Sequence, residues 1–317
     1  MDLTSLIFND DSFETDMARI ALPLLSNAKR DGYTPQGLFY SVYKAENAKA
    51  LFTVCHGFSE GMHKYREFIY ILLNAGYSVV IYEQRGHGRS VRPIKDINTV
   101  HIDTFSSYIE DLRYVTKEIA IKEADGLPMY LFGHSMGGCI ATLFQEKYPL
   151  YYKKLILSSP MLGIHMADGI KAPLGRLIAA SAVKMKKSKD RVPMMGEEKE
   201  KFETSLTTGK SRWLYTQKIR NANPLIKTSA PTFGWAYAAL KASKEAVKDE
   251  DKINIPTLLF QAEDETMVSN REEDKFAKNN SFVVLVRVKG SRHEILLSPK
   301  AVLEEYYSAL FNFIKER

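Results

Sequence analysis

The residues of this sequence that are best suited to chemistry are Gly133-His134-Ser135-Met136-Gly137. They follow a short apolar run at 129–132 and precede a segment with apolar residues at helical spacing. A serine in the pattern Gly-x-Ser-x-Gly between a strand and a helix is typical of a tight turn. The two glycines have no side chains, so neighbouring segments of the backbone can approach the nucleophile closely. The unpaired N–H groups at the start of the helix face an oxyanion formed beside the serine. We therefore predict Ser135 as the nucleophile of an acyl transfer.

A serine hydroxyl needs a histidine as general base, and a third residue must hold that histidine in the right tautomer. In sites that begin with this turn, the acid and then the histidine follow the serine along the chain. Of the seven histidines, only His165 and His293 follow Ser135. His165 precedes every suitable acid, whereas His293 comes after the apolar run 282–288. We therefore predict His293 as the base.

The acid is expected in the loop after the strand that precedes His293 along the chain. The apolar run 257–261 leads into Ala262-Glu263-Asp264-Glu265, so three carboxylates lie close together. A loop acid is by default simply solvated, and only the serine and histidine already identified give it a role. We predict Asp264 as the acid, with Glu263 as the alternative.

A second oxyanion donor is expected in the loop after the first core strand, where His56-Gly57-Phe58 stands. We predict that the backbone N–H groups of Phe58 and Met136 form the oxyanion hole. His56 itself is expected to pack and steady this loop.

Acyl transfer of this kind requires neither a metal ion nor a cofactor, and we predict none. The two cysteines, Cys55 and Cys139, belong to no cluster with metal-ligand spacing. The segment 85–90 (RGHGRS) has neither a third spaced glycine nor the ending of a phosphate-binding loop, so it is predicted to form a turn.

Short apolar runs that end in turn residues alternate along the chain with segments of helical periodicity. The predicted strands are 49–54, 77–82, 129–132, 154–158, 257–261 and 282–288. The predicted helices are 62–74, 108–121, 137–148 and 299–315. This alternation predicts an α/β fold with a mostly parallel central sheet covered by helices on both faces.

The alternation stops at 161–245, which is helical in pattern and rich in Met and Lys. We predict this segment as an inserted helical lid on a core formed by 1–160 and 246–317. Its Met, Tyr, Phe and Trp side chains suit an acyl chain, because they offer adaptable apolar surface. Two charge runs, 184–191 and 197–203, are predicted to be solvated, and the alternative is contact with phospholipid head groups.

The composition is that of a folded globular protein, with 317 residues, 45% apolar and 26% charged. The net charge of +6 comes without a dense basic stripe, which argues against a nucleic-acid partner. Two cysteines do not make a disulfide scaffold, and no segment resembles a signal peptide or a spanning helix. We expect a cytoplasmic protein with free thiols. The apolar stripe Met17, Ile20, Ala21, Leu24 and Leu25 is expected to dock on the protein's own core, and the alternative is membrane attachment through this stripe.

Eight segments carry a resemblance to the group of serine hydrolases that includes monoacylglycerol lipases and bacterial lysophospholipases, and most of all to the lysophospholipase L2 type. The resemblance covers nearly the whole chain. The segments are CHGFSEG at 55–61, EQRGHGRS at 83–90, FSSYIEDL at 105–112, GHSMGGCIATLF at 133–144, SPMLGI at 159–164, APTFGW at 230–235, QAEDETMVSN at 261–270 and KGSRHEIL at 289–296. The chain departs from the group at Glu83-Gln84, where Asp is more usual.

The resemblance implies an α/β-hydrolase fold with an inserted lid, and it places the nucleophile on Ser135, the acid on Asp264 and the base on His293. It favours Asp264 over Glu263. It also implies a single-chain lipid ester as substrate, with a lysophospholipid expected first. The charge runs of the lid add peripheral contact with the inner face of a membrane as an alternative partner interaction. The sequence indicates no particular oligomeric state.

Several other functions share this fold and must be weighed against a lysophospholipase. Monoacylglycerol lipase, carboxylesterase and thioesterase use the same three residues. A prolyl aminopeptidase-like peptidase would need an acidic site for an α-amino group, and the run 197–203 is its one candidate. A binding module without catalysis would be favoured by the loss of a triad member, yet all three are present.

Overall fold

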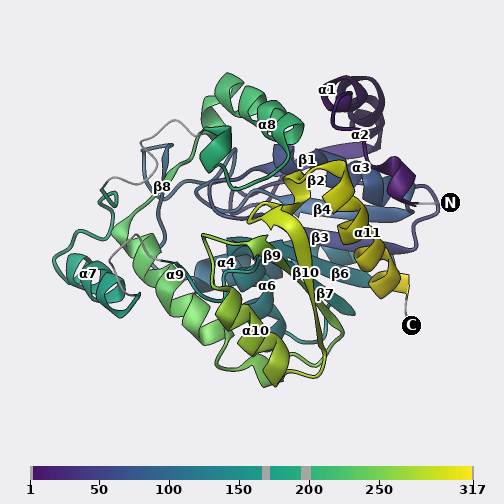
Figure 1. Ribbon diagram of the computed structural model, residues 1–317. Coiled ribbons are helices and arrows are strands. Elements are labelled where there is room, and N and C mark those ends of the chain that lie inside the picture. Colours follow the sequence, from purple (N-terminus) through teal and green to yellow (C-terminus); the bar gives the residue numbers. More distant parts are fainter. Residues whose placement is uncertain (1–2, 166–171, 194–200, 316–317) are drawn as a thin grey trace.

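One sheet of eight strands organises the fold (Figure 1). This computed structural model describes residues 3–165, 172–193 and 201–315. The strand order is β1-β2-β4-β3-β6-β7-β9-β10, and every neighbouring pair is parallel except β1 with β2 and β2 with β4. The strands are β1 Lys29–Tyr33, β2 Phe39–Tyr43, β3 Ala50–Cys55, β4 Tyr77–Tyr82, β6 Met129–His134, β7 Lys154–Ser158, β9 Thr257–Asp264 and β10 Val283–Arg292.

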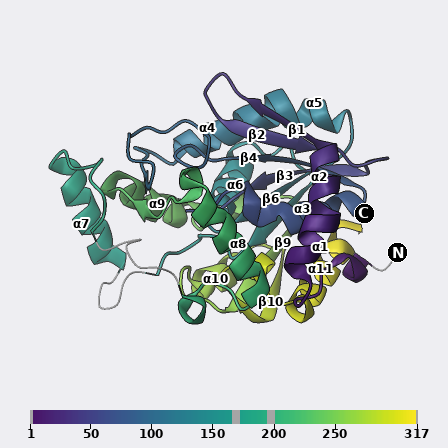
Figure 2. The same cartoon turned by 90° about the horizontal axis from the view of Figure 1, so that it is seen from above.

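Helices cover both faces of this sheet (Figures 1 and 2). One face carries η1 Leu3–Leu6, α1 Phe13–Asp16, η2 Met17–Ala21, α2 Leu22–Ala28, η3 Met62–Tyr65, α3 Arg66–Asn74 and α11 Lys300–Lys315. The other face carries α4 Ser106–Val115, η4 Thr116–Ala120, α5 Ile121–Ala124, α6 Met136–Lys147, α9 Phe233–Ala246 and α10 Asn270–Asn279. The predicted mostly parallel sheet with helices on both faces is therefore confirmed.

The central strands are buried along their whole length, because both faces of the sheet are covered. Every residue of β3, β4, β6 and β7 is buried. Successive side chains of a strand point to opposite faces. Leu51 and Phe52 of β3 accordingly belong to the two different core clusters. In the sequence, such strands appear as continuous apolar runs, and for this reason they could be predicted.

The antiparallel edge formed by β1 and β2 was not predicted from the sequence. Four of the five residues of β1 are exposed, so the strand carries no apolar run and no alternation that would reveal it. A further short pair, β5 Thr99–Val100 with β8 Ala230–Pro231, joins the core to the inserted segment.

Most of the N-terminal apolar stripe packs on the protein itself, as predicted, whereas Ile20 is 47% exposed. Met17 and Ala21 are fully buried and Leu25 is nearly so, all within the core cluster beside α3 and α11. Within the described ranges, no helix is both long enough and apolar enough to cross a membrane.

The inserted segment lies between β7 and β9. It contains α7 Ala172–Lys184, η5 Phe202–Thr204, α8 Lys210–Ala222, η6 Pro224–Ile226, β8, α9 and η7 Glu250–Lys252. Helix α9 packs on α6 and contributes Trp235 and Ala239 to the core. The lid boundaries at 161 and 245 stay predictions. Residues 197–200 of the acidic run lie outside the described residues, and the lysines of the run 184–191 are exposed.

Helix α8 of the insert is tied to the core by a buried arginine. Arg212 is fully buried, and its Nε and Nη2 donate to both carboxylate oxygens of Glu67 on α3 at 2.8 and 2.7 Å. Its Nη2 also donates to the carbonyl of Phe8 at 3.0 Å, and its Nη1 pairs with Asp10. Removing one partner of a buried pair leaves a charge without compensation, so this contact fixes α8 over the site described below.

We expect Arg212→Leu to lower the free energy of unfolding by about 3–5 kcal/mol, because Glu67 is left charged and buried. Lys218→Ala, on the same helix, is the matched control. Its ion pair with Glu14 is exposed on both sides, so its loss should change stability by about 1 kcal/mol or less. Urea unfolding followed by circular dichroism checks both values, and equal effects of the two variants would contradict this account of α8.

Candidate active site

Ser135 occupies a strained turn between β6 and α6. Its φ and ψ are +52° and −118°, a conformation that L-residues rarely adopt. The flanking glycines are sterically required. A Cβ on Gly133 would lie 2.5 Å from the carbonyl oxygen of Gly137, and one on Gly137 would lie 2.1 Å from that of Cys55. The tight turn expected from the Gly-x-Ser-x-Gly pattern is therefore found, and it lifts the serine to the carboxyl end of the sheet.

A chain of two hydrogen bonds runs from this serine to a carboxylate. Ser135 Oγ lies 2.9 Å from His293 Nε2, and His293 Nδ1 lies 2.8 Å from Glu265 Oε2. With Glu265 accepting from Nδ1–H, Nε2 is free to accept the serine proton. The side chains of His293 and Glu265 are only 6% and 1% exposed, so bulk water does not compete for these contacts.

The prediction that Asp264 is the acid is wrong, and so is its alternative Glu263. Asp264 is the last residue of β9, its side chain is 68% exposed, and its Oδ2 accepts from Arg292 Nε at 3.3 Å. Glu263 accepts from the amide of Gly290 at 2.8 Å. The strand continues three residues beyond the predicted end at Gln261, so the loop that faces the histidine begins only at Glu265.

The carboxylate of Glu265 is held in its charged form. Its Oε1 accepts from the amides of Met267 and Val268 at 2.7 and 3.2 Å, while Oε2 accepts from His293. Burial by itself raises the pKa of Glu265, but the hydrogen bond and charge of His293, together with the two amides, lower this pKa below its ordinary value. Glu265 is therefore ionised when the imidazole gains a proton.

The loop after β3 leaves one amide without an acceptor. The amide of Gly57 donates to Glu60 Oε2 at 2.7 Å, and that of Ser59 donates to His87 Nε2 at 3.2 Å. Between them, the N–H of Phe58 donates to no acceptor among the described residues. The bonds on either side hold the loop, so this free donor has a defined direction.

Met136 supplies the second free amide at the first residue of α6, where its N–H has no acceptor in the described parts of the chain. The two donor segments lie close together, since a Cβ on Gly57 would be 3.1 Å from that of Ser135. Fully buried His56 accepts from the amide of Gln84 at 2.9 Å and so ties this loop to the one after β4. This agrees with the steadying role predicted for His56.

A buried charged cluster, which sequence reasoning missed, supports the same loop. Glu60 is 5% exposed, accepts from the amide of Gly57 and from Tyr65 Oη at 2.8 Å, and lies 3.4 Å from both Lys64 Nζ and His134 Nε2. Burial raises the pKa of Glu60, yet Lys64 and His134 bring this pKa well below its usual range. The one sequence signal was the position of Glu60, three residues after Gly57.

A cavity of about 380 Å³ opens beside Ser135 and His293. Its volume suits part of a small-molecule ligand. The lining is mixed: apolar side chains and polar or charged ones both reach it. The apolar lining residues include Phe58, Leu206 and Trp213. The polar or charged ones include His63, Gln217 and Arg220. Within the described residues, no group of three or more His, Cys, Asp or Glu is placed to hold a metal ion.

Comparison with known proteins adds to this geometry. Residues 46–300 match the model of a hydrolase family described as serine aminopeptidase, S33. Lysophospholipase L2 of Escherichia coli strain K12 is 28% identical over 284 residues, which cover 86% of this chain and 82% of that protein. Human monoglyceride lipase is 28% identical over 245 residues, covering 76% and 72% of the two chains.

The solved structures agree on the fold. A soluble variant of monoglyceride lipase from Saccharomyces cerevisiae, in complex with a substrate analogue, superposes with a TM-score of 0.74 at 18% identity and covers 91% of this chain and 94% of that one. The α/β-hydrolase fold expected from the sequence is thereby confirmed.

Replacing Glu265 with Gln should lower kcat for a p-nitrophenyl ester about 10⁴-fold, because the amide no longer favours the required tautomer or stabilises the imidazolium. Asp264→Asn is the matched control, and we expect its kcat to stay within about twofold, since its side chain is 68% exposed and its hydrogen bond is to Arg292. Steady-state kinetics at neutral pH checks both. A large loss in Asp264→Asn with little loss in Glu265→Gln would reverse the assignment.

Glu60→Gln should lower kcat roughly tenfold to a hundredfold with little change in KM. The shifted loop would turn the Phe58 amide away from the oxyanion, and this contact is made only in the transition state. Glu110→Gln, whose carboxylate pairs with Lys147 on the surface, is the control and should leave both constants unchanged. An effect of Glu60→Gln on KM alone would argue that the cluster serves substrate binding instead.

Proposed function

Because the chain belongs to the hydrolase family described as serine aminopeptidase, S33, we propose that Ser135, His293 and Glu265 form its catalytic triad. The chain is a carboxylic ester hydrolase of the lipase and lysophospholipase group. The observation that carries the triad is the unbroken chain of hydrogen bonds from the serine to the buried carboxylate.

The reaction proceeds by two acyl transfers. Ser135 Oγ attacks the ester carbonyl while His293 Nε2 takes its proton, and Glu265 stabilises the imidazolium. The amides of Phe58 and Met136 donate to the oxyanion. Collapse of the intermediate releases the alcohol, which takes the proton from His293. Water then attacks the acyl-enzyme with His293 again as base, which frees the fatty acid and restores Ser135.

We propose a lysophospholipid as the substrate. His63 supports a polar head group: it lines the cavity, is 8% exposed, and neither ring nitrogen has a hydrogen-bond partner in the described parts of the chain. Burial, with help from Lys64 and Arg66, lowers the pKa of His63 to about 3, so the ring is neutral and offers one donor and one acceptor. Arg220 adds positive charge to the same wall, which suits a phosphate, whereas Lys64 is paired with Glu60 and Glu294, which also line the cavity.

A monoacylglycerol is the second candidate, because its glycerol hydroxyls also match a neutral imidazole and because monoglyceride lipases are among the relatives. A general carboxylesterase would not need the polar wall. A peptidase that binds an α-amino group would need an acidic site, and the two acids that line this cavity, Glu60 and Glu294, are already paired with Lys64.

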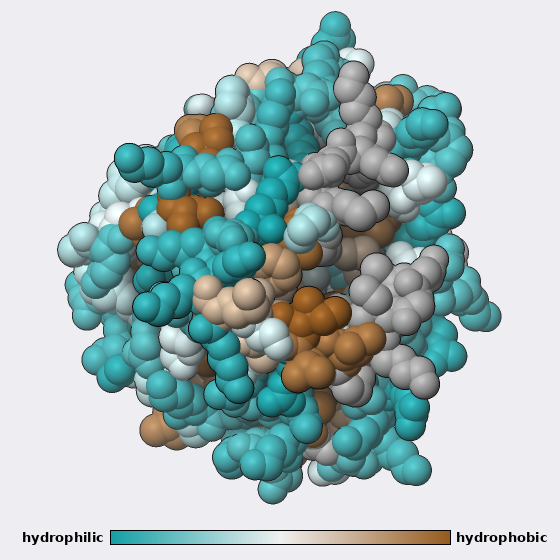
Figure 3. All heavy atoms as spheres, turned by 90° about the vertical axis from the view of Figure 1, so that its left-hand side faces the viewer, coloured by the Kyte–Doolittle hydropathy of each residue, from teal (hydrophilic) through white to brown (hydrophobic). Residues whose placement is uncertain are grey.

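We further propose peripheral contact with a membrane at the inner face of the cell. Figure 3 views the face that carries α7 and α9, and apolar side chains gather near its centre within a hydrophilic surround. On α7, Leu174, Leu177 and Ile178 are 49%, 63% and 46% exposed, and exposed lysines follow from Lys184. An apolar patch with basic neighbours suits anionic lipid. The buried free thiols of Cys55 and Cys139 fit a reducing compartment.

The substrate proposal is tested with a matched panel: a lysophosphatidylcholine, a lysophosphatidylethanolamine and a monoacylglycerol of one chain length, with p-nitrophenyl butyrate as a short ester. We expect kcat/KM for the lysophospholipids to exceed that for the monoacylglycerol about tenfold, which corresponds to one charge-assisted hydrogen bond. Ser135→Ala should be inactive on all four. Cleavage of the monoacylglycerol alone would overturn the head-group proposal, whereas activity retained in Ser135→Ala would overturn the mechanism.

A further inference from the structure

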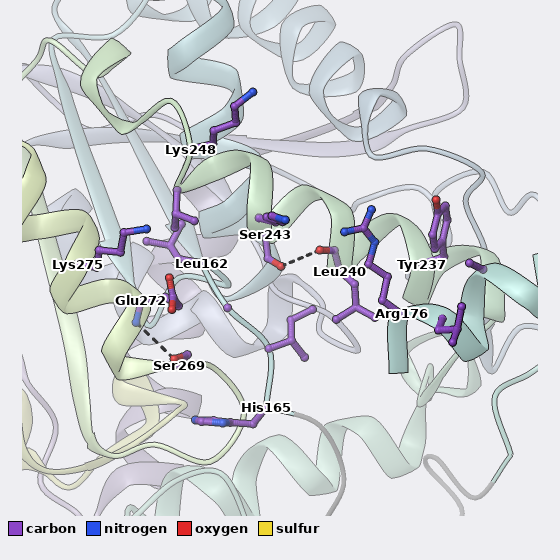
Figure 4. A pocket seen from close by; sticks show the side chains of 16 residues that line it. Leu162, His165, Arg176, Tyr237, Leu240, Ser243, Lys248, Ser269, Glu272 and Lys275 are labelled. Atoms are coloured by element: carbon purple, nitrogen blue, oxygen red, sulfur yellow. Dashed lines mark hydrogen bonds between the residues drawn. The ribbon is translucent and has the colours of Figure 1, made fainter. Parts of the chain in front are cut away.

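A cavity larger than the one beside Ser135 lies away from the triad. It measures about 920 Å³ and lies among α7, α9, α10 and the segment 162–165 (Figure 4). It shares no lining residue with the cavity beside Ser135. In Figure 4, Lys275 and Glu272 of α10 stand at one end, and Arg176 of α7 and Tyr237 of α9 stand at the other.

The floor of this cavity is apolar and buried. Leu162 is 1% exposed and Val247 is 8% exposed, and Ile164 and Leu240 continue the same surface. The lining residues of α9 recur at 237, 240 and 243–244, and Val247 and Lys248 follow the helix directly, so one face of α9 forms the wall. Leu177 of α7, which is 63% exposed, lies at the opening. A floor of this kind favours an alkyl chain.

The rim has an excess of positive charge. Arg176, Lys244, Lys248 and Lys275 are exposed side chains of the lining, against the single acid Glu272. None of the four cations has an ion pair with a described residue, unlike Lys241 of α9, which does not line the cavity and pairs with Glu245 at 3.7 Å. Four cations beside one carboxylate leave the rim short of anions, and an anionic head group would supply the missing partner.

A backbone wall separates this cavity from the triad. The amide of His165 donates to the carbonyl of Met267 at 3.0 Å, and the amide of Ser269 donates to that of Gly163 at 3.1 Å. Met267 lines the cavity beside Ser135, whereas Gly163, His165 and Ser269 line the larger one. A ligand in the larger cavity therefore leaves the serine accessible.

We propose that this cavity binds a long-chain fatty acid, with the alkyl chain on the apolar floor and the carboxylate among the rim cations. The choice of occupant rests on the proposed function, because hydrolysis of a lipid ester releases such a carboxylate. The site needs both parts of the ligand: a free inorganic anion lacks the chain, and a neutral amphiphile lacks the charge.

The test uses the full chain with Ser135 covalently blocked by a long-chain fluorophosphonate, so that the catalytic cavity is filled. Mass spectrometry of the labelled protein confirms the block, and calorimetric titration with decanoate then measures the second site. We expect one decanoate to bind per chain. The double variant Lys244→Glu/Lys248→Glu should weaken binding about tenfold or more, as the loss of a charge-assisted contact predicts. Lys241→Glu, a single charge reversal on α9 at a residue that does not line the cavity, should weaken binding much less.

Two further probes separate the contribution of the alkyl chain to binding from that of the carboxylate charge. Decanamide keeps the chain without the charge and inorganic phosphate keeps charge without the chain, so each should bind at least about tenfold more weakly than decanoate. Loss of all decanoate binding after the block, equal binding of decanamide, or equal weakening by Lys241→Glu would each overturn the proposal. Failure of the fluorophosphonate to label Ser135 would count against the catalytic proposal instead. In that case the same titration is made on Ser135→Ala, where the two charge reversals must still weaken binding.

Discussion

The hydrogen bond between His293 and Glu265 is the interaction on which the arrangement of the site depends. It orients the imidazole toward Ser135, and its two residues directly follow the adjacent parallel strands β9 and β10. The carboxyl ends of parallel strands meet at one edge of a sheet, so residues distant in sequence converge there. Strand β6 delivers the serine to the same edge through a turn that only flanking glycines permit.

Around this chain of contacts, buried charges hold the two backbone segments whose amides we propose as donors to the developing oxyanion. Glu60 fixes the loop after β3 through the Gly57 amide and is itself matched by Lys64 and His134. Because His134 lies in the serine turn, one carboxylate links both segments that carry the free amides. The insert is tied down in a similar way, through Arg212 and Glu67. Stability and catalysis thus use buried ion pairs at two places on the same end of the sheet.

The sequence allowed a correct prediction where a local residue pattern marks both an element of the fold and its chemical role. Ser135 follows from its glycines and flanking elements, His293 from chain order, and the central strands from apolar runs that mark complete burial. Edge strand β1 escaped prediction because its side chains face solvent. The acid was misplaced because three adjacent carboxylates have the same chemistry, and only the true end of β9 decides which one turns inward. Glu60 was missed because its role depends on contacts with residues far along the chain.

The most direct test of this account is proton NMR of the ring N–H on His293 Nδ1, because an imidazole proton held by a buried carboxylate is protected from water and resonates downfield of the amide region. We expect this resonance in the wild type and in Asp264→Ala, and its loss in Glu265→Ala, with His293→Ala giving the assignment. Its persistence in Glu265→Ala together with its loss in Asp264→Ala would contradict the central claim that Glu265 holds the histidine.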